Sequence, residues 1–146
     1  MGNPVVLSPQ QHEKIMSSFR AQSMMATLGA SLHLSGPGQT EISAPILDDS
    51  RQQQGFAHAG LTFAIGDSAA GYAALSLMPD DHEVLTTEMK INLLAPGKGD
   101  HLIARGRVIK PGRRLMVVQA DVFAVTGGAE KHIALLTGTM MPVLPG

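Results

Sequence analysis

The segment from Gln52 to Pro79, QQQGFAHAGLTFAIGDSAAGYAALSLMP, constrains the fold more than any other part of the chain. It predicts a short polar loop, a His-Ala-Gly turn and then about five turns of helix. The helix ends near Pro79, because proline cannot continue it. Apolar residues lie on nearly every side, a pattern typical of a helix that other structure surrounds. We therefore expect the rest of the chain to wrap around this helix.

Asp67 is the only acidic residue of this helix. On a helical wheel it shares a face with mostly small residues, namely Gly60, Phe63, Ala64, Ala70, Gly71 and Ala74. Glycine inside a helix costs about 1 kcal/mol relative to alanine, so Gly66 and Gly71 indicate close approach of other backbone or of a ligand. A carboxylate in such surroundings must be hydrogen-bonded, paired or chemically useful. A purely structural bond to nearby backbone, or a position facing water at an interface, stays open.

The remaining sequence predicts one more helix and about six strands. The helix begins at Ser8 and Pro9 and ends near Arg20, and its buried stripe comprises Ile15, Met16 and Phe19. Strands are expected over Met24–Leu34, Thr40–Ile46, Val84–Leu94, His101–Lys110, Arg113–Val125 and Lys131–Met141. Tight turns join the last three, which predicts an antiparallel meander. We expect one α+β domain over residues 1–146, with an antiparallel sheet curled around the central helix.

Alternation within the strand Val84–Leu94 predicts which side chains share a face. One face would carry Leu85, Thr87, Met89, Ile91 and Leu93, and the other would carry Thr86, Glu88, Lys90 and Asn92. We therefore expect Thr86 to lie on the polar side of this strand.

Composition excludes several classes of protein. The chain has no cysteine, which rules out disulfides, thiol catalysis and trypsin-like proteases despite the sequence Gly66-Asp67-Ser68. The net charge of −1 and the absence of tryptophan argue against nucleic-acid or membrane partners. The N-terminal segment lacks a basic region followed by an apolar core, so we expect no secretory signal there. No apolar run reaches the length of a membrane span, so no span is expected either. We expect a soluble cytoplasmic protein.

Three motifs at characteristic spacing carry a family resemblance. They are Gly55-Phe56-Ala57-His58-Ala59-Gly60, Asp67 on the helix that follows, and Thr86 in a strand that ends Asn92-Leu93-Leu94-Ala95-Pro96. From about Pro9 to Met141 the chain resembles the hotdog-fold thioesterases, most closely the acyl-CoA thioesterases of the phenylacetic-acid-degradation (PaaI-like) type. The resemblance implies a hotdog fold and hydrolysis of an acyl-CoA, with an aryl-acyl group among the candidates.

The resemblance also implies catalytic roles. Asp67 would attack the thioester carbonyl or activate a water molecule. The backbone N–H of Ala59, with Gly60 beside it, would hold the carbonyl oxygen at the helix start, where the helix dipole favours negative charge. Gln52 would position the water. The family usually has glycine at the position of Ala59 and asparagine at that of Gln52. Only glycine adopts a positive φ readily, so alanine suits the turn only if φ at position 59 is negative.

Two further residues, Thr86 and His58, each allow more than one interpretation. Thr86 matches a strand hydroxyl that orients the water across a subunit boundary in some family members, although an ordinary strand residue would look the same. His58 could act as a general base, but a histidine that precedes a helix more often bonds backbone and shapes the turn. We favour the orienting role for His58.

A basic run surrounds one predicted hairpin and includes Arg105, Arg107, Lys110, Arg113 and Arg114. Lys110, Arg113 and Arg114 flank a Pro-Gly turn and are candidates for binding the phosphates of coenzyme A, with Lys98 and then Lys90 as the next candidates. A solvated hairpin is the alternative. The six histidines lack ligand spacing, so no metal site is predicted, and no cofactor is expected apart from the coenzyme A of the substrate.

These observations favour a thioesterase with a homodimer as the minimal active unit, paired further into a homotetramer. A hotdog enoyl-CoA hydratase or dehydratase is one alternative, but it would require a histidine and an aspartate that both reach the substrate. A non-catalytic acyl-CoA-binding protein is the other alternative.

Overall fold

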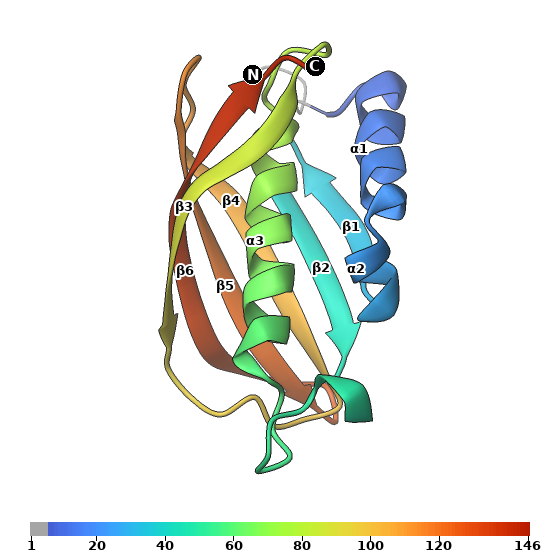
Figure 1. The fold of residues 1–146 in the computed structure, drawn as a ribbon, viewed down its shortest axis with the longest axis vertical. Coiled ribbons are helices and arrows are strands. Elements are labelled where there is room, and N and C mark those ends of the chain that lie inside the picture. The colour runs from blue at the N-terminus through green and yellow to red at the C-terminus, as the bar shows by residue number, and fades with distance from the viewer. Residues whose placement is uncertain (1–5) are drawn as a thin grey trace.

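The computed structural model describes residues 6–146 (Figure 1). Residues 1–5, part of the segment expected to lack a secretory signal, lie outside it. The helices are α1 (Pro9–Ala21), α2 (Ser23–Thr27), the 3-10 helix η1 (Asp48–Ser50) and α3 (Ala59–Leu75). The strands are β1 (Ser31–Gly36), β2 (Gln39–Pro45), β3 (Glu83–Leu93), β4 (His101–Lys110), β5 (Met116–Thr126) and β6 (Ala129–Val143). Within residues 6–146, no helix has the length and apolar character needed to cross a membrane.

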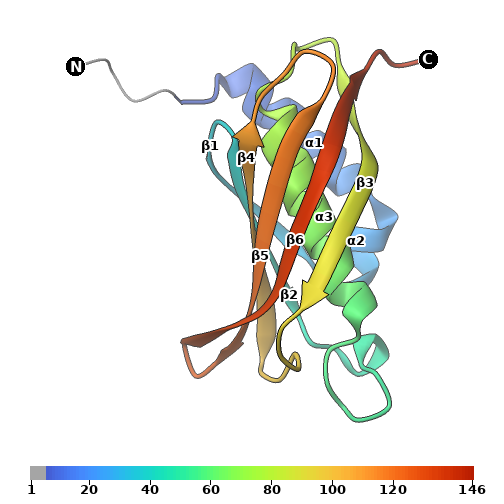
Figure 2. The same ribbon diagram turned by 90° about the vertical axis from the view of Figure 1, so that its left-hand side faces the viewer.

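All six strands form one antiparallel sheet in the order β1-β2-β4-β5-β6-β3. The sheet curls around α3, and Figures 1 and 2 show this helix lying in its concave face. The predicted α+β fold, with a curled antiparallel sheet around a long helix, is therefore confirmed. β1 and β3 are the two edges of the sheet, and β3 bonds only to β6.

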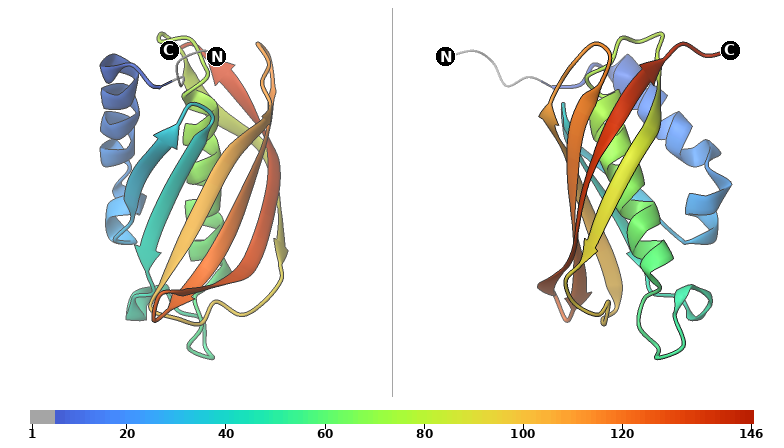
Figure 3. Two further views of the ribbon diagram at one scale, coloured as in Figure 1. Left: turned by 180° about the vertical axis from the view of Figure 1, so that it is seen from behind. Right: turned by 60° about the vertical axis from the view of Figure 1, so that its left-hand side comes forward.

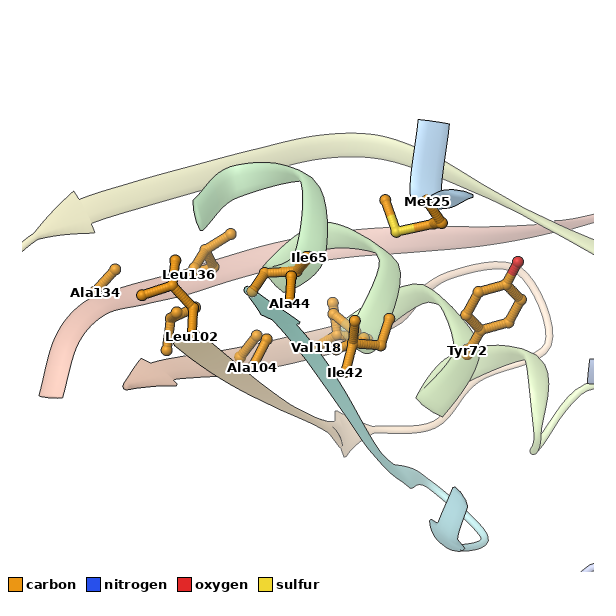
Figure 4. Close-up of a cluster of buried hydrophobic side chains, with 14 of the residues drawn as sticks. Met25, Ile42, Ala44, Ile65, Tyr72, Leu102, Ala104, Val118, Ala134 and Leu136 are labelled. Atoms are coloured by element: carbon orange, nitrogen blue, oxygen red, sulfur yellow. The ribbon is translucent and has the colours of Figure 1, made fainter. Parts of the chain in front are cut away.

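Close backbone approach fixes α3 on the sheet. A Cβ atom at Gly106 of β4 would overlap the backbone of Ala69 and Ala70, so only glycine allows the helix to lie this near. The hydroxyl of Thr40 on β2 donates to the carbonyl of Ala69. Figure 4 shows the apolar side chains between the two layers, and Ile65 of α3 is fully buried there. Burial of this kind supplies most of the driving force for folding.

The N-terminal helices cover the side of α3 next to β1, while the convex face of the sheet carries no helix (Figure 3). Ser8 caps α1 and forms a capping box with Gln11. Phe19 of α1 is buried and meets the ring of Tyr72 on α3 edge-on, with 6.1 Å between ring centroids. α1 is thus fastened to the C-terminal half of α3.

The prediction of a strand from Met24 was wrong. Residues 23–27 form α2, which buries Met25 against the core, and β1 begins only at Ser31. Gly29 has a φ of +67°, the left-handed conformation that commonly ends a helix. Tertiary burial of Met25 and this glycine stop outweigh the weak strand pattern.

Met89 and Ile91 share one face of β3 as predicted, but Thr86 does not lie on the opposite face, because the strand contains a bulge between Thr86 and Glu88. The extra residue shifts the alternation by one position. Thr86 therefore points toward α3 on the same side as the later residues Met89 and Ile91, whereas Leu85 is 53% exposed. On β6, Gly138 accommodates the bulge, since a Cβ atom there would lie 2.6 Å from the carbonyl oxygen of Glu88.

Candidate active site

One stripe of α3 is left uncovered by the sheet, between β3 and α1 (Figure 1). We call it the open stripe. Its members are Ala59, Gly60, Phe63, Ala64, Asp67 and Ser68, none of which is buried. Their recurrence every three to four residues puts them on one side of the helix. The candidate acid and the candidate oxyanion donor thus lie on the same open surface.

Asp67 is half-buried and bound by one neighbouring side chain. The hydroxyl of Thr86 donates to its Oδ1 atom over 2.8 Å. Burial raises the pKa of Asp67, because the charged form loses hydration, and the Thr86 hydrogen bond partly opposes this rise. A carboxylate with a raised pKa is a stronger base than an ordinary exposed aspartate.

The Thr86–Asp67 contact lies within one chain, and the bulge in β3 makes it possible. The hydroxyl oxygen of Thr86 also lies 3.2 Å from the sulfur of the buried Met140. The single hydroxyl proton of Thr86 therefore has two acceptors within reach. Strict alternation placed Thr86 on the opposite, polar face. The role of orienting water across a subunit boundary stays a prediction.

A cavity of about 350 Å³ opens beside Asp67. It is lined by Ser18, Gln22, Asp67, Ser68, Gly71, Tyr72, Glu83, Val84, Leu85 and Thr86. No pattern in the sequence placed Ser18 of α1, or Gln22 directly after α1, near the acid. The one signal for Tyr72 was that it is the single tyrosine of the chain and lies in a largely apolar helix.

The other end of the open stripe carries the candidate oxyanion donor. His58 caps α3, and its Nδ1 atom accepts a hydrogen bond from the N–H of Gly60 over 2.8 Å. Among the contacts of residues 6–146, the N–H of Ala59 has no acceptor. In the same part of the chain no residue other than glycine has a positive φ, so alanine is unstrained at position 59. Ala59 is thus the free donor, while Gly60 is occupied by His58.

Gln52 turns its amide into the loop before the helix. Its Oε1 atom accepts from the N–H of Gln54 over 2.5 Å and from that of Phe56 over 3.2 Å. Gln52 also lines a cavity of about 290 Å³ together with Ala59, Phe56 and Leu93. The side chain therefore shapes the loop and borders the space next to the free N–H.

One chain does not bring these two ends together. Asp67 follows Ala59 by eight residues, which corresponds to about 12 Å along the helix. The cavity next to Asp67 and the cavity next to Ala59 share no lining residue. A substrate carbonyl cannot contact both groups of the same chain at once.

The basic residues of the predicted phosphate-binding run fall into two groups, those paired with carboxylates and those that are exposed. Arg105 bonds Glu41 and Glu130, and Arg107 bonds Asp121. Lys110, the last residue of β4, is exposed, as are Arg113 and Arg114 on the β4–β5 turn. This turn begins at Pro111, and β5 starts at Met116 rather than at Arg113 as predicted.

The turn and Lys98 lie at opposite ends of the molecule. Arg113 shares a cavity with Leu77 and Met78, just past the C-terminal end of α3. Lys98 shares one with Phe56 and Pro96, near the N-terminal end of α3. The four predicted cations therefore do not form one cluster within a chain.

The architecture and the site have counterparts in known proteins. The profile of the thioesterase superfamily matches residues 54–131, more than half of the chain. A thioesterase family protein from Silicibacter pomeroyi is 42% identical, with a TM-score of 0.90 over 92% of this chain and 99% of that one. The PaaI protein of the E. coli phenylacetic acid degradation operon shares the fold, with a TM-score of 0.81 at 21% identity over 94% and 96% of the two chains.

A Saccharolobus solfataricus protein that bears the name of an esterase is 37% identical over 75 residues, or 51% of this chain and 48% of that protein. That match spans about half of the relative's length. The fold and these similarities define the class of the chain as a thioesterase-family protein with the hotdog architecture. The chain belongs to the thioesterase superfamily.

Proposed function

We propose that the protein hydrolyses an acyl-CoA thioester to the free acid and coenzyme A, in the cytoplasm. The observation that carries this proposal is the half-buried Asp67, which has a raised pKa and faces a cavity large enough for a small acyl group. A thioester suits such a site because an ordinary thiol has a pKa of about 8.5. Its thiolate leaves without strong acid assistance.

Two routes use the same residues. In one, Asp67 takes a proton from water, hydroxide adds to the carbonyl carbon, and the bond to sulfur breaks with return of the proton to the thiolate. In the other, Asp67 itself attacks the carbonyl, and the bond to sulfur breaks to release the thiolate and leave a mixed anhydride. Water then hydrolyses this anhydride to the free acid and Asp67, and a proton of that water neutralises the thiolate. In both, negative charge develops on the carbonyl oxygen, where the free N–H of Ala59 at a helix N-terminus is suited to bind it.

The complete site requires two protomers, because one chain separates its acid from its donor. Phe63 lies midway between Ala59 and Asp67 and is 37% exposed. If two α3 helices pair antiparallel about a twofold axis at Phe63, Ala59 of each faces Asp67 of the other. The unpaired edge of β3 and its exposed Leu85 and Leu93 would meet their counterparts in the same dimer. Further pairing into a tetramer is also part of the proposal.

The nucleotide of coenzyme A would lie at the β4–β5 turn. Lys110, Arg113 and Arg114 are exposed and make no ion pair within residues 6–146. In the antiparallel dimer this turn lies at the same end as the partner's loop from Gln52 to Gly55. Lys98 and Lys90 are the next candidates.

Release of thiol from a panel of acyl-CoA substrates tests the proposal. We expect steady turnover with at least one short or aryl acyl-CoA and free acid as the second product. Hydration of an enoyl-CoA without thiol release would show a hydratase instead. A copurified acyl-CoA that is bound but never cleaved would show a binding protein.

A further inference from the structure

Resting on the proposed function, we infer that the cavity beside Asp67 takes the acyl group, and that Tyr72, Gln22 and Ser18 select acyl groups ending in a neutral hydrogen-bonding group. A hydroxyl at the far end of a short acyl chain is the simplest example. These residues come from α1 and α3 and stand apart from the reacting carbonyl.

Gly71 opens the cavity between the acid and this polar end. A Cβ atom at Gly66 would lie 2.8 Å from the side chain of Leu136, so Gly66 serves the packing of α3 on the sheet. A Cβ atom at Gly71 would meet only Met140, at 3.8 Å, which is an ordinary contact. The space at Gly71 is therefore not needed for packing and is free for a ligand.

The far end of the cavity is polar and already organised. Tyr72 is only 4% exposed. Gln22 Nε2 donates to its hydroxyl oxygen over 2.5 Å, and Ser18 Oγ lies 3.2 Å from the same atom. Together the two hydroxyls and the amide have more donors and acceptors than these contacts use. An incoming hydroxyl would find partners there, whereas a methyl group would leave the cluster's remaining groups unpaired.

Charge further narrows the class of ligand. Two carboxylates, Asp67 and Glu83, line the cavity. Its lining, within residues 6–146, includes no lysine, arginine or histidine. An acyl group that ends in a carboxylate would be repelled and would lack a counter-ion. The selected terminus is therefore polar but uncharged.

The rise of α3 sets the scale for the length of the acyl group. Tyr72 is five residues beyond Asp67, about 7.5 Å along the axis. An extended chain of about six carbons spans that distance. Because Ser18 of α1 and Gln22 directly after it stand at the far end, longer chains would meet this helix.

Three six-carbon substrates test the inference, namely 6-hydroxyhexanoyl-CoA, hexanoyl-CoA and adipoyl-CoA. We expect kcat/KM for the hydroxylated substrate to exceed that for hexanoyl-CoA about tenfold, with adipoyl-CoA the poorest. Equal rates for the first two, in an enzyme that hydrolyses acyl-CoA, would overturn this inference alone. Failure to hydrolyse any acyl-CoA would overturn the proposed function and this inference with it.

Tyr72→Phe keeps the ring against Phe19 and removes the hydroxyl. It should abolish the preference by lowering kcat/KM for 6-hydroxyhexanoyl-CoA to about that for hexanoyl-CoA. Equal losses for both substrates would assign Tyr72 a structural role only. Ser18→Ala provides a second variant on a less buried residue and should reduce the preference in the same direction. Ser17→Ala, an exposed neighbour on α1, is its matched control and should change neither substrate.

Discussion

The two ends of the open stripe are built in different ways. The acid end lies in the middle of α3, where Asp67 is half-buried, bonded to Thr86 on the sheet and flanked by α1. The donor end lies where α3 begins, and a polar loop and the cap residue His58 hold its backbone in place. At one end, desolvation makes the Asp67 carboxylate a stronger base. At the other end, the backbone N–H of Ala59 has no acceptor and can bind an oxygen atom. Each end alone is chemically incomplete, so pairing of chains is expected to control activity.

Asp67→Asn tests the acid end most directly, because it removes the charge with little change in volume. We expect kcat to fall by at least ~100-fold while the fold and the oligomer persist. Thiol release measures the rate, and circular dichroism and sedimentation check the structure. Wild-type turnover in this variant would eliminate the mechanism.

Phe63→Glu tests whether the two ends meet across a twofold axis. It would place two like charges at the proposed axis, close to Asp67, and should convert the dimer into monomers with a loss of activity of about tenfold or more. Sedimentation and thiol release are measured at the same concentration. Met24→Glu, at a 54% exposed position on α2, serves as control and should stay dimeric. A fully active monomer would refute the composite site.

Thr86→Val removes the hydrogen bond to Asp67 and keeps the β-branched shape. Because that bond lowers the pKa of Asp67, its loss should raise the pKa and move the acid limb of the kcat/KM profile to higher pH. We expect a loss of about tenfold near the acid limb. Thr87→Val is the matched control, since Thr87 bonds the carbonyl of Thr139 instead. An unshifted profile would remove Thr86 from the site.

Arg113→Ala/Arg114→Ala tests whether the β4–β5 turn binds the nucleotide, which is remote from the carbonyl. KM should rise several-fold with little change in kcat. The difference from wild type should shrink at high salt, because exposed charges are screened over about 10 Å at 0.1 M. An acyl-pantetheine thioester, which lacks the nucleotide, should be unaffected. Equal losses on both substrates, or none on either, would leave the turn as a solvated hairpin.

The smallest expected effect is on stability. The pKa of Asp67 is raised in the fold, so the native state binds this proton more tightly than the unfolded chain. The contribution of Asp67 to the free energy of unfolding therefore decreases as pH rises from the unfolded pKa, 3.8, through the raised native value. Asp67→Asn should melt at a higher temperature than wild type at pH 7. The difference should shrink toward pH 4, and a constant difference would contradict this account.

The sequence predicted the parts of the site that depend on local pattern. The apolar helix, its start near Ala59 and the antiparallel meander follow from periodicity and turn residues. The face of β3 on which Thr86 lies could not be predicted from local pattern, because a bulge depends on the neighbouring strand and on Gly138. The placement of Ser18 and Gln22 was also out of reach, since it depends on how α1 docks against Tyr72. Local signals fixed the elements, and packing decided which side chains meet.

The backbone contact between Gly106 and α3 has a consequence for how such an enzyme can diversify. With Ala69 and Ala70 resting directly on a strand, α3 can neither rotate nor slide without a steric clash. The packing of α3 on the sheet therefore determines the orientation of Asp67, and small substitutions cannot change it gradually. α1 has no such contact and meets α3 through side chains, among them Phe19 and Ser18. New substrate preferences would therefore arise by exchange of residues on α1, over a catalytic frame that stays constant.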